Sequence, residues 1–225
     1  MLTTWGTVTA LDRAALDLSD EAAIRNTVRT LRPDVIVNPA AYTAVDKAET
    51  EPELAYAINA EAPRILAEEA AELGARMVHY STDYVFDGRA SKPYRETDMT
   101  NPLGVYGASK LAGEQAVQQA GAQHLILRTS WVYGAYGKNF LHTILRLARE
   151  RENLGIVADQ FGAPTSSHDI ASATLTLLKS WQPERSGIYH LTNSGYTSWH
   201  GFAVAILHAY EGLQAERGWP PLRVS

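Results

Sequence analysis

Short apolar runs alternate with longer amphipathic stretches along the first 130 residues. Four runs have the length and the branched composition of buried strands, and they lie at residues 7–11, 35–38, 76–80 and 124–128. Helical patterns separate them, at residues 20–31, 52–73 and 102–121. Ser19 is expected to cap the first helix and Gly74 to end the second. Near-continuous apolar strands alternating with helices predict an α/β fold with a Rossmann-like, doubly wound parallel sheet covered on both faces.

The pattern becomes looser after about residue 135. Helices are expected at residues 138–151, 167–180 and 198–211, with short strands near 154–157 and 187–191. We therefore predict two domains, a larger α/β domain over residues 1–135 and a smaller α/β lobe over residues 136–225.

Composition narrows the classes of function. The net charge is -5 with no basic block, so nucleic acid is not an expected partner. The absence of cysteine excludes disulfides and thiolate metal sites. No apolar run approaches the ~20 residues that a membrane span requires, and no signal-peptide pattern is present. We expect a cytoplasmic protein without a membrane partner.

Polar residues follow several of the predicted strands. Asp12, Asn38, the segment 81–83 and the segment 129–130 each stand where an apolar run ends. Ligands of open parallel sheets bind beyond the carboxyl ends of the strands. The sequence therefore predicts a binding site at this edge of the sheet.

Tyr106 and Lys110 are four residues apart on a predicted helix and so share one face of it. An ammonium beside a phenol lowers the tyrosine pKa from about 10, which makes the phenol a usable acid or base. With a hydroxyl at a strand end, such as Thr82, the pair can reduce or oxidise a carbonyl beside a nicotinamide. Alone, the pair is common by chance, and an aromatic ring packed on a lysine stem is the alternative.

Six stretches, taken together, carry a resemblance to a known family. They are residues 32–38, 43–46, 79–86, 106–110, 128–133 and 159–165. In order and spacing they resemble the extended short-chain dehydrogenase/reductases, and within them the dTDP-4-dehydrorhamnose reductase family. The resemblance implies an oxidoreductase that reduces the 4-keto group of dTDP-4-dehydro-L-rhamnose to dTDP-L-rhamnose with NADPH or NADH, in polysaccharide biosynthesis. It also implies that residues 1–135 form the dinucleotide-binding domain and that residues 136–225 bind mainly the substrate.

The resemblance implies a role for each catalytic candidate. Thr82 and Tyr106 hydrogen-bond the sugar carbonyl oxygen, and Tyr106 passes on its proton. Lys110 stabilises the phenolate and binds the nicotinamide ribose. Four further residues are implied substrate contacts: Val45, Asp83, Tyr84 and Trp131. Packing is the alternative for Trp131, and a turn cap is the alternative for Asp83.

Other positions concern the cofactor. Asp12 ends a predicted strand, where an acid can bind the adenosine ribose, and Arg13 could accept a 2′-phosphate, so NADH and NADPH both stay open. Residues 17–18, Asp17 and Leu18, resemble the family's adenine-contacting dipeptide. Ala40, Ala41 and Tyr42 are expected to line the pyrophosphate and nicotinamide-ribose side, with helix packing as the alternative for the alanines.

The family begins with a strand, a Gly-x-x-Gly-x-x-Gly loop and a helix that together hold the pyrophosphate. These 225 residues contain no such motif. We therefore expect a chain truncated at both ends, which binds NADPH weakly or not at all. The resemblance allows a homodimer and magnesium at a dimer contact, but no metal residue is assigned. The alternatives are another sugar-nucleotide 4-ketoreductase or epimerase, and a non-catalytic family member that binds a partner protein.

Overall fold

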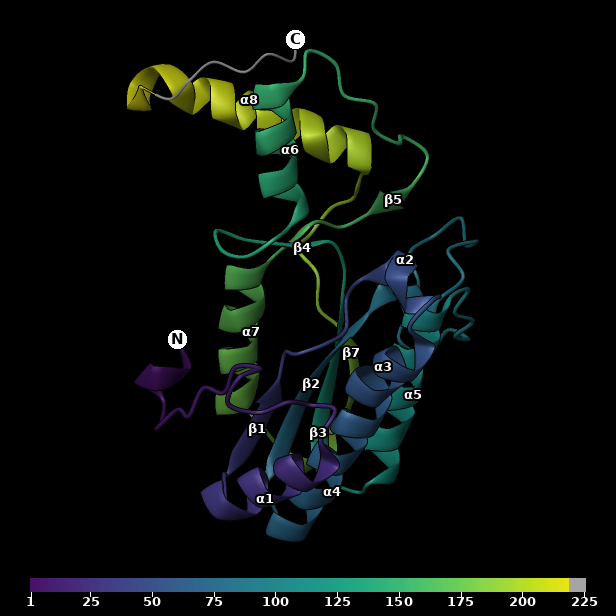
Figure 1. Ribbon diagram of the computed structural model, residues 1–225, viewed down its shortest axis with the longest axis vertical. Helices are drawn as coiled ribbons and strands as arrows, with labels where there is room; N and C mark the ends of the chain where they lie inside the picture. The colour runs from purple at the N-terminus through teal and green to yellow at the C-terminus, as the bar shows by residue number, and fades with distance from the viewer. Residues whose placement is uncertain (219–225) are drawn as a thin grey trace. The chain divides into compact units, whose positions relative to one another are not determined.

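The computed structural model describes residues 1–218, apart from the side chain of residue 215. Its centre is a sheet of four parallel strands in the order β1-β2-β3-β7 (Figure 1). Their bounds are Val35–Asn38, Arg76–Thr82, Gln123–Thr129 and Gly187–His190. The parallel α/β architecture is therefore confirmed, and so are the three predicted strands that form β1, β2 and β3.

Helices cover both faces of this sheet (Figure 1). On one face, Met77 and Ile126 pack against α1 (Glu21–Leu31), α4 (Ala62–Leu73) and α5 (Val105–Gln119). On the other, Val78 and Leu127 pack against Leu178 at the end of α7 (Ser167–Lys179). Successive side chains of a strand alternate between the faces, and a sheet buried on both faces accounts for the nearly continuous apolar runs in the sequence.

The predicted helix over residues 52–73 is one helical stretch with a wide turn inside it. It consists of α3 (Pro52–Tyr56), the π-helical segment η2 (Ala57–Glu61) and α4. Gly74 ends α4 in the left-handed conformation, at a φ of 67°, which a residue without Cβ adopts at low cost. The predicted end at Gly74 is confirmed.

The expected cap of the first helix is wrong. The N-cap of α1 is Asp20, whose carboxylate accepts a hydrogen bond from the Ala23 backbone N–H at 2.9 Å. Ser19 instead donates from its hydroxyl and its backbone N–H to Asp17 Oδ1. Serine and aspartate are both common N-cap residues, but the Ser19 hydroxyl is already bonded to Asp17 in a local turn, so Asp20 caps the helix.

Two predicted strands do not form within the described residues. Residues 7–11 are exposed, and no ladder in this part of the chain includes them. Residues 154–157 form no ladder either. A strand is stable only where a neighbouring strand pairs with its backbone groups, so an apolar run without that neighbour stays irregular.

The chain divides into two compact units. The first contains Met1–Thr129 and Leu177–Leu191, and the second contains Ser130–Thr176 and the residues from Thr192 onward. The strand predicted near residues 187–191 is β7, which pairs with β3 in the main sheet, so this part of the expected lobe belongs to the first unit. The division of binding roles between the two domains stays a prediction.

The second unit has its own small core. Ile144 of α6 (Phe140–Glu150) packs with Phe202 and Ile206 of α8 (Trp199–Arg217). Two short ladders join β4 (Val132–Tyr133) to β6 (Thr165–Ser166) and β5 (Phe161–Gly162) to β8 (Thr197–Ser198). The remaining elements are α2 (Val45–Ala48) and the short 3-10 helices η1 (Leu2–Thr4), η3 (Asp83–Val85) and η4 (Pro183–Arg185). Within the described part of the chain, no helix is both long enough and apolar enough to cross a membrane.

Candidate active site

Thr82 is the last residue of β2 and lies buried at the carboxyl end of the sheet. Its hydroxyl donates to Asp83 Oδ1 at 3.0 Å and accepts from the Tyr84 backbone N–H at 3.2 Å. The second bond caps η3, and both bonds hold the hydroxyl in one orientation. The strand-end position that the sequence predicts for Thr82 is therefore confirmed.

Tyr106 reaches the same place from the first turn of α5. A Cβ at Gly107 would collide with the Tyr84 carbonyl oxygen, so only glycine lets α5 approach the segment after β2 this closely. The Tyr84 and Tyr106 rings meet edge to face with centroids 5.4 Å apart. Hydrogen bonding with the Thr82 hydroxyl lowers the pKa of Tyr106, but burial outweighs it and raises that pKa to about 12. The two hydroxyls therefore lie within hydrogen-bonding reach of one another.

The expectation that Lys110 lowers the pKa of Tyr106 is wrong for this structure. Burial is the main cause of the high phenol pKa, and the Asp83 carboxylate acts in the same direction. The Lys110 amine is directed elsewhere: Nζ donates to the Tyr80 carbonyl oxygen at 2.7 Å and lies 3.3 Å from His79 Nε2. Tyr106 is thus held as a neutral phenol, which is the form that can give up a proton.

Lys110 is a buried lysine with a shifted pKa. Its side chain is 2% exposed, and burial lowers its pKa to about 8, against the opposing pull of Glu114. Asp83 shows the matching effect for an acid, because burial raises its pKa to about 6 despite hydrogen bonds from Thr82 and the backbone. Three titratable groups with shifted pKa values therefore gather at the end of β2, which is typical of a functional site.

Asn59 fixes the loop that follows β1, and sequence reasoning missed it. Its side chain accepts from the Tyr42 backbone N–H at 2.8 Å and donates to the Tyr42 carbonyl and to Ser109 Oγ, each at 3.0 Å. These bonds bring Ala40, Ala41 and Tyr42 beside α5. A lone asparagine among apolar residues at 57–60 was the available signal, because a buried amide needs partners.

His79 is a buried histidine whose two ring nitrogens both face polar side chains. The ring is fully buried, and its two nitrogens face Lys110 Nζ and Asn38 Nδ2, each at 3.3 Å. Burial, followed by the nearby Lys110 charge, lowers the pKa of His79 well below its usual value. The ring therefore stays neutral and contacts one of the catalytic candidates.

The substrate candidates of the first unit are near the same strand end. Val45 begins α2, and Asp83 and Tyr84 form the turn after Thr82, where the Tyr84 ring is 46% exposed. In the second unit, Trp131 stacks on Trp199 with centroids 3.6 Å apart. The backbone of Trp131 is left-handed, with a φ of 46°, which is a costly conformation for a bulky residue. The packing alternative is thus observed for Trp131, and its contact with substrate stays a prediction.

The adenosine-side candidates form only local contacts. Asp12 Oδ1 accepts from the Ala15 backbone N–H at 3.0 Å, and Arg13 and Asp17 form an exposed ion pair at 3.9 Å. The pKa of Asp17 is lowered by its hydrogen bonds with Ser19. Leu18 packs against the core below α1. These four residues lie in the first unit, and none of the hydrogen bonds within residues 1–218 links them to the catalytic candidates.

The nicotinamide-ribose side of a dinucleotide cofactor is the part for which the expected residues are present. Ala40 and Ala41 are small, and Tyr42 after them is held through its backbone N–H by Asn59. Their contact with the nicotinamide ribose stays a prediction. The pyrophosphate end has no such match, because the 225 residues contain no Gly-x-x-Gly-x-x-Gly. The start of α1 is closed by the Asp20 carboxylate, which repels phosphate. No group of three or more candidate metal ligands occurs among the described residues.

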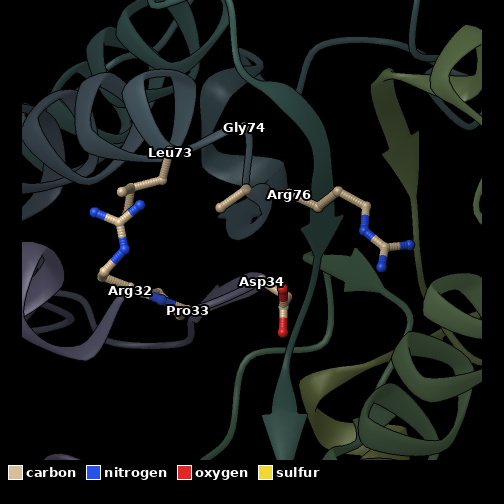
Figure 2. Close-up of a pocket in the computed structure, with 7 residues that line it drawn as sticks. Arg32, Pro33, Asp34, Leu73, Gly74 and Arg76 are labelled. Carbon is tan, nitrogen blue, oxygen red and sulfur yellow. The ribbon is translucent and has the colours of Figure 1, made fainter.

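A shallow polar depression of about 360 Å³ lies at the opposite end of the sheet (Figure 2). It is lined by Arg32, Pro33, Asp34, Leu73, Gly74, Ala75 and Arg76. These residues lie before β1 or at the start of β2, whereas Thr82 is the last residue of β2. Figure 2 shows the guanidinium groups of Arg32 and Arg76 pointing away from one another. The depression therefore has no convergent charges and is separate from the candidate active site.

Comparison with known proteins agrees with this geometry. The family described as "RmlD substrate binding domain" matches residues 2–217. The dTDP-4-dehydrorhamnose reductase of Burkholderia thailandensis is 50% identical over 98% of this chain and 75% of its own length. That of Escherichia coli is 52% identical over 84% of this chain and 64% of its own length. The chain thus spans between 64% and 75% of the length of these relatives.

Solved structures lead to the same family. The dTDP-4-dehydrorhamnose reductase of Bacillus anthracis, in complex with NADP, has a TM-score of 0.85 and 41% identity, covering 89% of this chain and 70% of that one. The Clostridium acetobutylicum reductase has a TM-score of 0.87 and 40% identity, covering 91% and 71%. A Thermus thermophilus UDP-glucose 4-epimerase, at 21% identity and a TM-score of 0.74, shows the fold alone. This chain belongs to the dTDP-4-dehydrorhamnose reductase family.

Proposed function

We propose that this chain carries the proton-donating site of an NADPH-dependent reductase that converts the 4-keto group of dTDP-4-dehydro-L-rhamnose to the hydroxyl of dTDP-L-rhamnose. The curated relatives are named for this activity, and the Bacillus anthracis neighbour was solved with NADP. The observation that carries the proposal is the placement of Thr82, Tyr106 and Lys110 at the carboxyl end of β2.

The chemistry follows from what these side chains can hold. The nicotinamide, when bound, supplies the hydride. Negative charge then develops on the sugar carbonyl oxygen. The Tyr106 hydroxyl donates a hydrogen bond to that oxygen, and the Thr82 hydroxyl donates a second one when it turns from Asp83 Oδ1. Donors of this kind contribute a few kcal/mol. Tyr106, kept as a neutral phenol by its raised pKa of about 12, gives its proton to that oxygen. Lys110 lies four residues further along the same helix, and its amine would stabilise the phenolate once the proton is transferred.

The remaining contacts belong to the same proposal. Val45, Asp83, Tyr84 and Trp131 are the proposed contacts of the sugar nucleotide. Ala40, Ala41, Tyr42 and Lys110 would bind the nicotinamide-ribose side of the cofactor, and Asp12, Arg13, Asp17 and Leu18 its adenosine side. A homodimer in the cytoplasm is part of this proposal.

Turnover of the chain and of two tyrosine variants tests the proposal. NADPH oxidation is followed by absorbance with the dTDP-4-keto sugar as substrate, and the sugar product is identified by chromatography. Removing the Tyr106 hydroxyl in Tyr106→Phe removes the proton donor, so kcat should fall by about 10²–10⁴-fold while substrate binding persists. Tyr189→Phe is the matched control, because that hydroxyl donates to the Arg185 carbonyl on the surface.

Three outcomes would contradict the proposal. Near wild-type turnover in the Tyr106→Phe variant would show that Tyr106 is not the proton donor. Conversion of the sugar without net NADPH consumption would favour an epimerase. A folded chain that binds neither NADPH nor the sugar nucleotide would favour the non-catalytic alternative.

A further inference from the structure

Trp131 is a bulky residue in a left-handed backbone conformation, with a φ of 46°. Among the non-glycine residues that the structure describes, only Arg32 shares this conformation, and Arg32 is the C-cap of α1, where left-handed residues are common. Trp131 lies instead between the end of β3 and the start of β4. Because such a conformation is costly for a large side chain, the contacts around Trp131 must hold it there, and strain of this kind is concentrated at functional sites.

One face of the Trp131 indole is covered by Trp199. The two rings stack with centroids 3.6 Å apart and an angle of 9° between their planes. Trp199 is the first residue of α8, and the start of that helix is fixed because Ser198 Oγ accepts from the Gly201 backbone N–H at 3.0 Å. Phe140, the first residue of α6, also packs against the Trp199 ring, at a centroid distance of 4.6 Å. Trp199 is therefore itself held by contacts at the starts of two helices.

The opposite face of the Trp131 indole is closed by the backbone of β5. A Cβ on Gly162 would lie 2.5 Å from Cε2 and 2.7 Å from both Cζ2 and Nε1 of the ring. The gap of 3.6 Å between the stacked rings is too narrow for an atom in that position, so Gly162 lies on the face away from Trp199. Gly162 does not have a positive φ, so its missing side chain, and not its backbone conformation, is what allows this close approach.

One short ladder places both contacts. β5 pairs with β8 so that Gly162 lies opposite Thr197, two residues before Trp199. The backbone of the indole residue is tied to the same part of the chain, because the Thr165 N–H donates to the Trp131 carbonyl oxygen at 3.3 Å. The Trp131 side chain is nevertheless only partly buried, and none of the hydrogen bonds among the described residues uses its Nε1–H. The ring is thus fixed in orientation while its donor stays available to a ligand.

We infer that Trp199 and Gly162 are positioning residues, which hold the Trp131 indole from its two faces for contact with the sugar nucleotide. The inference rests on the proposed function, in which Trp131 contacts that substrate. Loss of either contact would leave the Trp131 side chain in the protein but free to turn, and its strained backbone could then relax. Substrate affinity should therefore depend on two residues that the proposed function does not place against the substrate.

The stack can be observed without any ligand. In the chain labelled with fluorotryptophan, the ¹⁹F resonance of Trp131 is assigned by its loss in Trp131→Phe. The Trp199 ring shields this resonance, so we expect it to move in Trp199→Leu, and also in Gly162→Ala, where the new methyl group displaces the indole. Gly155→Ala is the matched control, because a Cβ at Gly155 meets nothing within 4 Å. A Trp131 resonance that stays in place in both test variants would overturn the inference.

Binding of dTDP-L-rhamnose, measured by calorimetry, tests the role itself. Trp199→Leu and Gly162→Ala should each raise the Kd by about tenfold or more. Trp199→Phe keeps an aromatic face against the indole and should restore most of the affinity. Phe202→Leu is the control for loss of a core aromatic, because Phe202 belongs to the same core and its ring contacts are with Tyr133 and Phe140. An equally large rise of the Kd in Phe202→Leu would overturn the inference.

A double variant shows whether Trp199 acts through Trp131. Trp131→Leu combined with Trp199→Leu should bind no more weakly than Trp131→Leu alone, since the positioned ring is already missing. Additive losses would overturn the positioning role. A wild-type chain that does not bind dTDP-L-rhamnose would overturn the proposed function and the positioning role with it. Wild-type binding together with an unchanged Kd in Trp199→Leu would overturn the positioning role alone.

Discussion

Two regions of the first unit, both expected to bind parts of one cofactor–substrate pair, differ in how they are held. Around Thr82, Tyr106 and Lys110, side chains from β1, β2, η2 and α5 interlock through buried hydrogen bonds. The polar side chains of residues 12–17 make only local contacts, such as the exposed Arg13–Asp17 pair. Side chains of the first region are held by partners from other elements, whereas the polar side chains of the second are held only by residues close to them in the sequence. Substitutions should therefore have large effects in the first region and small effects in the second.

The largest effect on stability should come from the buried ion pair beneath the active site. Arg128 binds Glu114 through two bonds, at 2.9 and 2.7 Å, and the two side chains are 4% and 1% exposed. Arg128→Leu leaves the Glu114 carboxylate buried without its partner. The free energy of unfolding, measured by chemical denaturation, should fall by about 3–5 kcal/mol.

A double variant separates charge from packing at this pair. Arg128→Leu combined with Glu114→Leu removes both charges, so much of the lost stability should return. A double variant as unstable as the single one would mean that packing of the Arg128 stem, which also lies over the Phe86 ring at 5.0 Å, is the dominant contribution.

The next effect is a pH dependence with opposite signs in the two regions. The pKa of Asp83 is raised to about 6 in the folded chain, against roughly 3.9 when unfolded. Between these values the folded state binds more protons, so stability falls as the pH rises from about 4 to about 6. At about 1.4 kcal/mol per pH unit, the advantage of Asp83→Asn over wild type should grow by roughly 2–3 kcal/mol between pH 4 and pH 7.

Asp17→Asn is the matched control in the exposed region. The pKa of Asp17 is lowered by its bonds with Ser19, so its ionised form stabilises the folded chain. That contribution is fully present above about pH 4 and is lost as the pH falls through the lowered value. Thermal unfolding from pH 3 to pH 7 should therefore give the two variants opposite slopes relative to wild type, and equal slopes would contradict the comparison.

Gly107→Ala should have an intermediate effect. The added methyl group would meet the Tyr84 carbonyl oxygen, which belongs to the backbone and cannot rotate away. Overpacking of this kind costs about 1–3 kcal/mol, measured as a lower denaturation midpoint at unchanged slope. Gly6→Ala is the control, because a Cβ at Gly6 meets nothing within 4 Å. If both variants lose the same stability, close approach of α5 is not what requires Gly107.

The sequence correctly predicted the features that are determined by residues close together along the chain. The apolar runs of β1, β2 and β3, the helix end at Gly74 and the strand-end position of Thr82 all follow from local pattern. Local pattern does not contain burial or distant partners. For that reason the pKa direction of Tyr106 was wrong, and the bonds of His79 to residues 31 and 41 positions away were not expected. Residues 7–11 have the composition of a strand, but pairing decides whether a strand forms.

The smallest effect on stability should be at Arg13. Its side chain is 79% exposed and its bond to Asp17 is 3.9 Å long, so Arg13→Ala should change the free energy of unfolding by less than about 0.5 kcal/mol. Binding is the sharper readout, because a guanidinium that accepts the 2′-phosphate distinguishes NADPH from NADH. If Arg13 has that role, calorimetry should show about tenfold weaker NADPH binding and unchanged NADH binding. Arg146→Ala, which removes an exposed pair with Glu150, controls for net charge. An equal loss of affinity for NADPH and NADH would show that Arg13 does not bind the 2′-phosphate. Residues 12–17 would then have no role in the choice between the two cofactors.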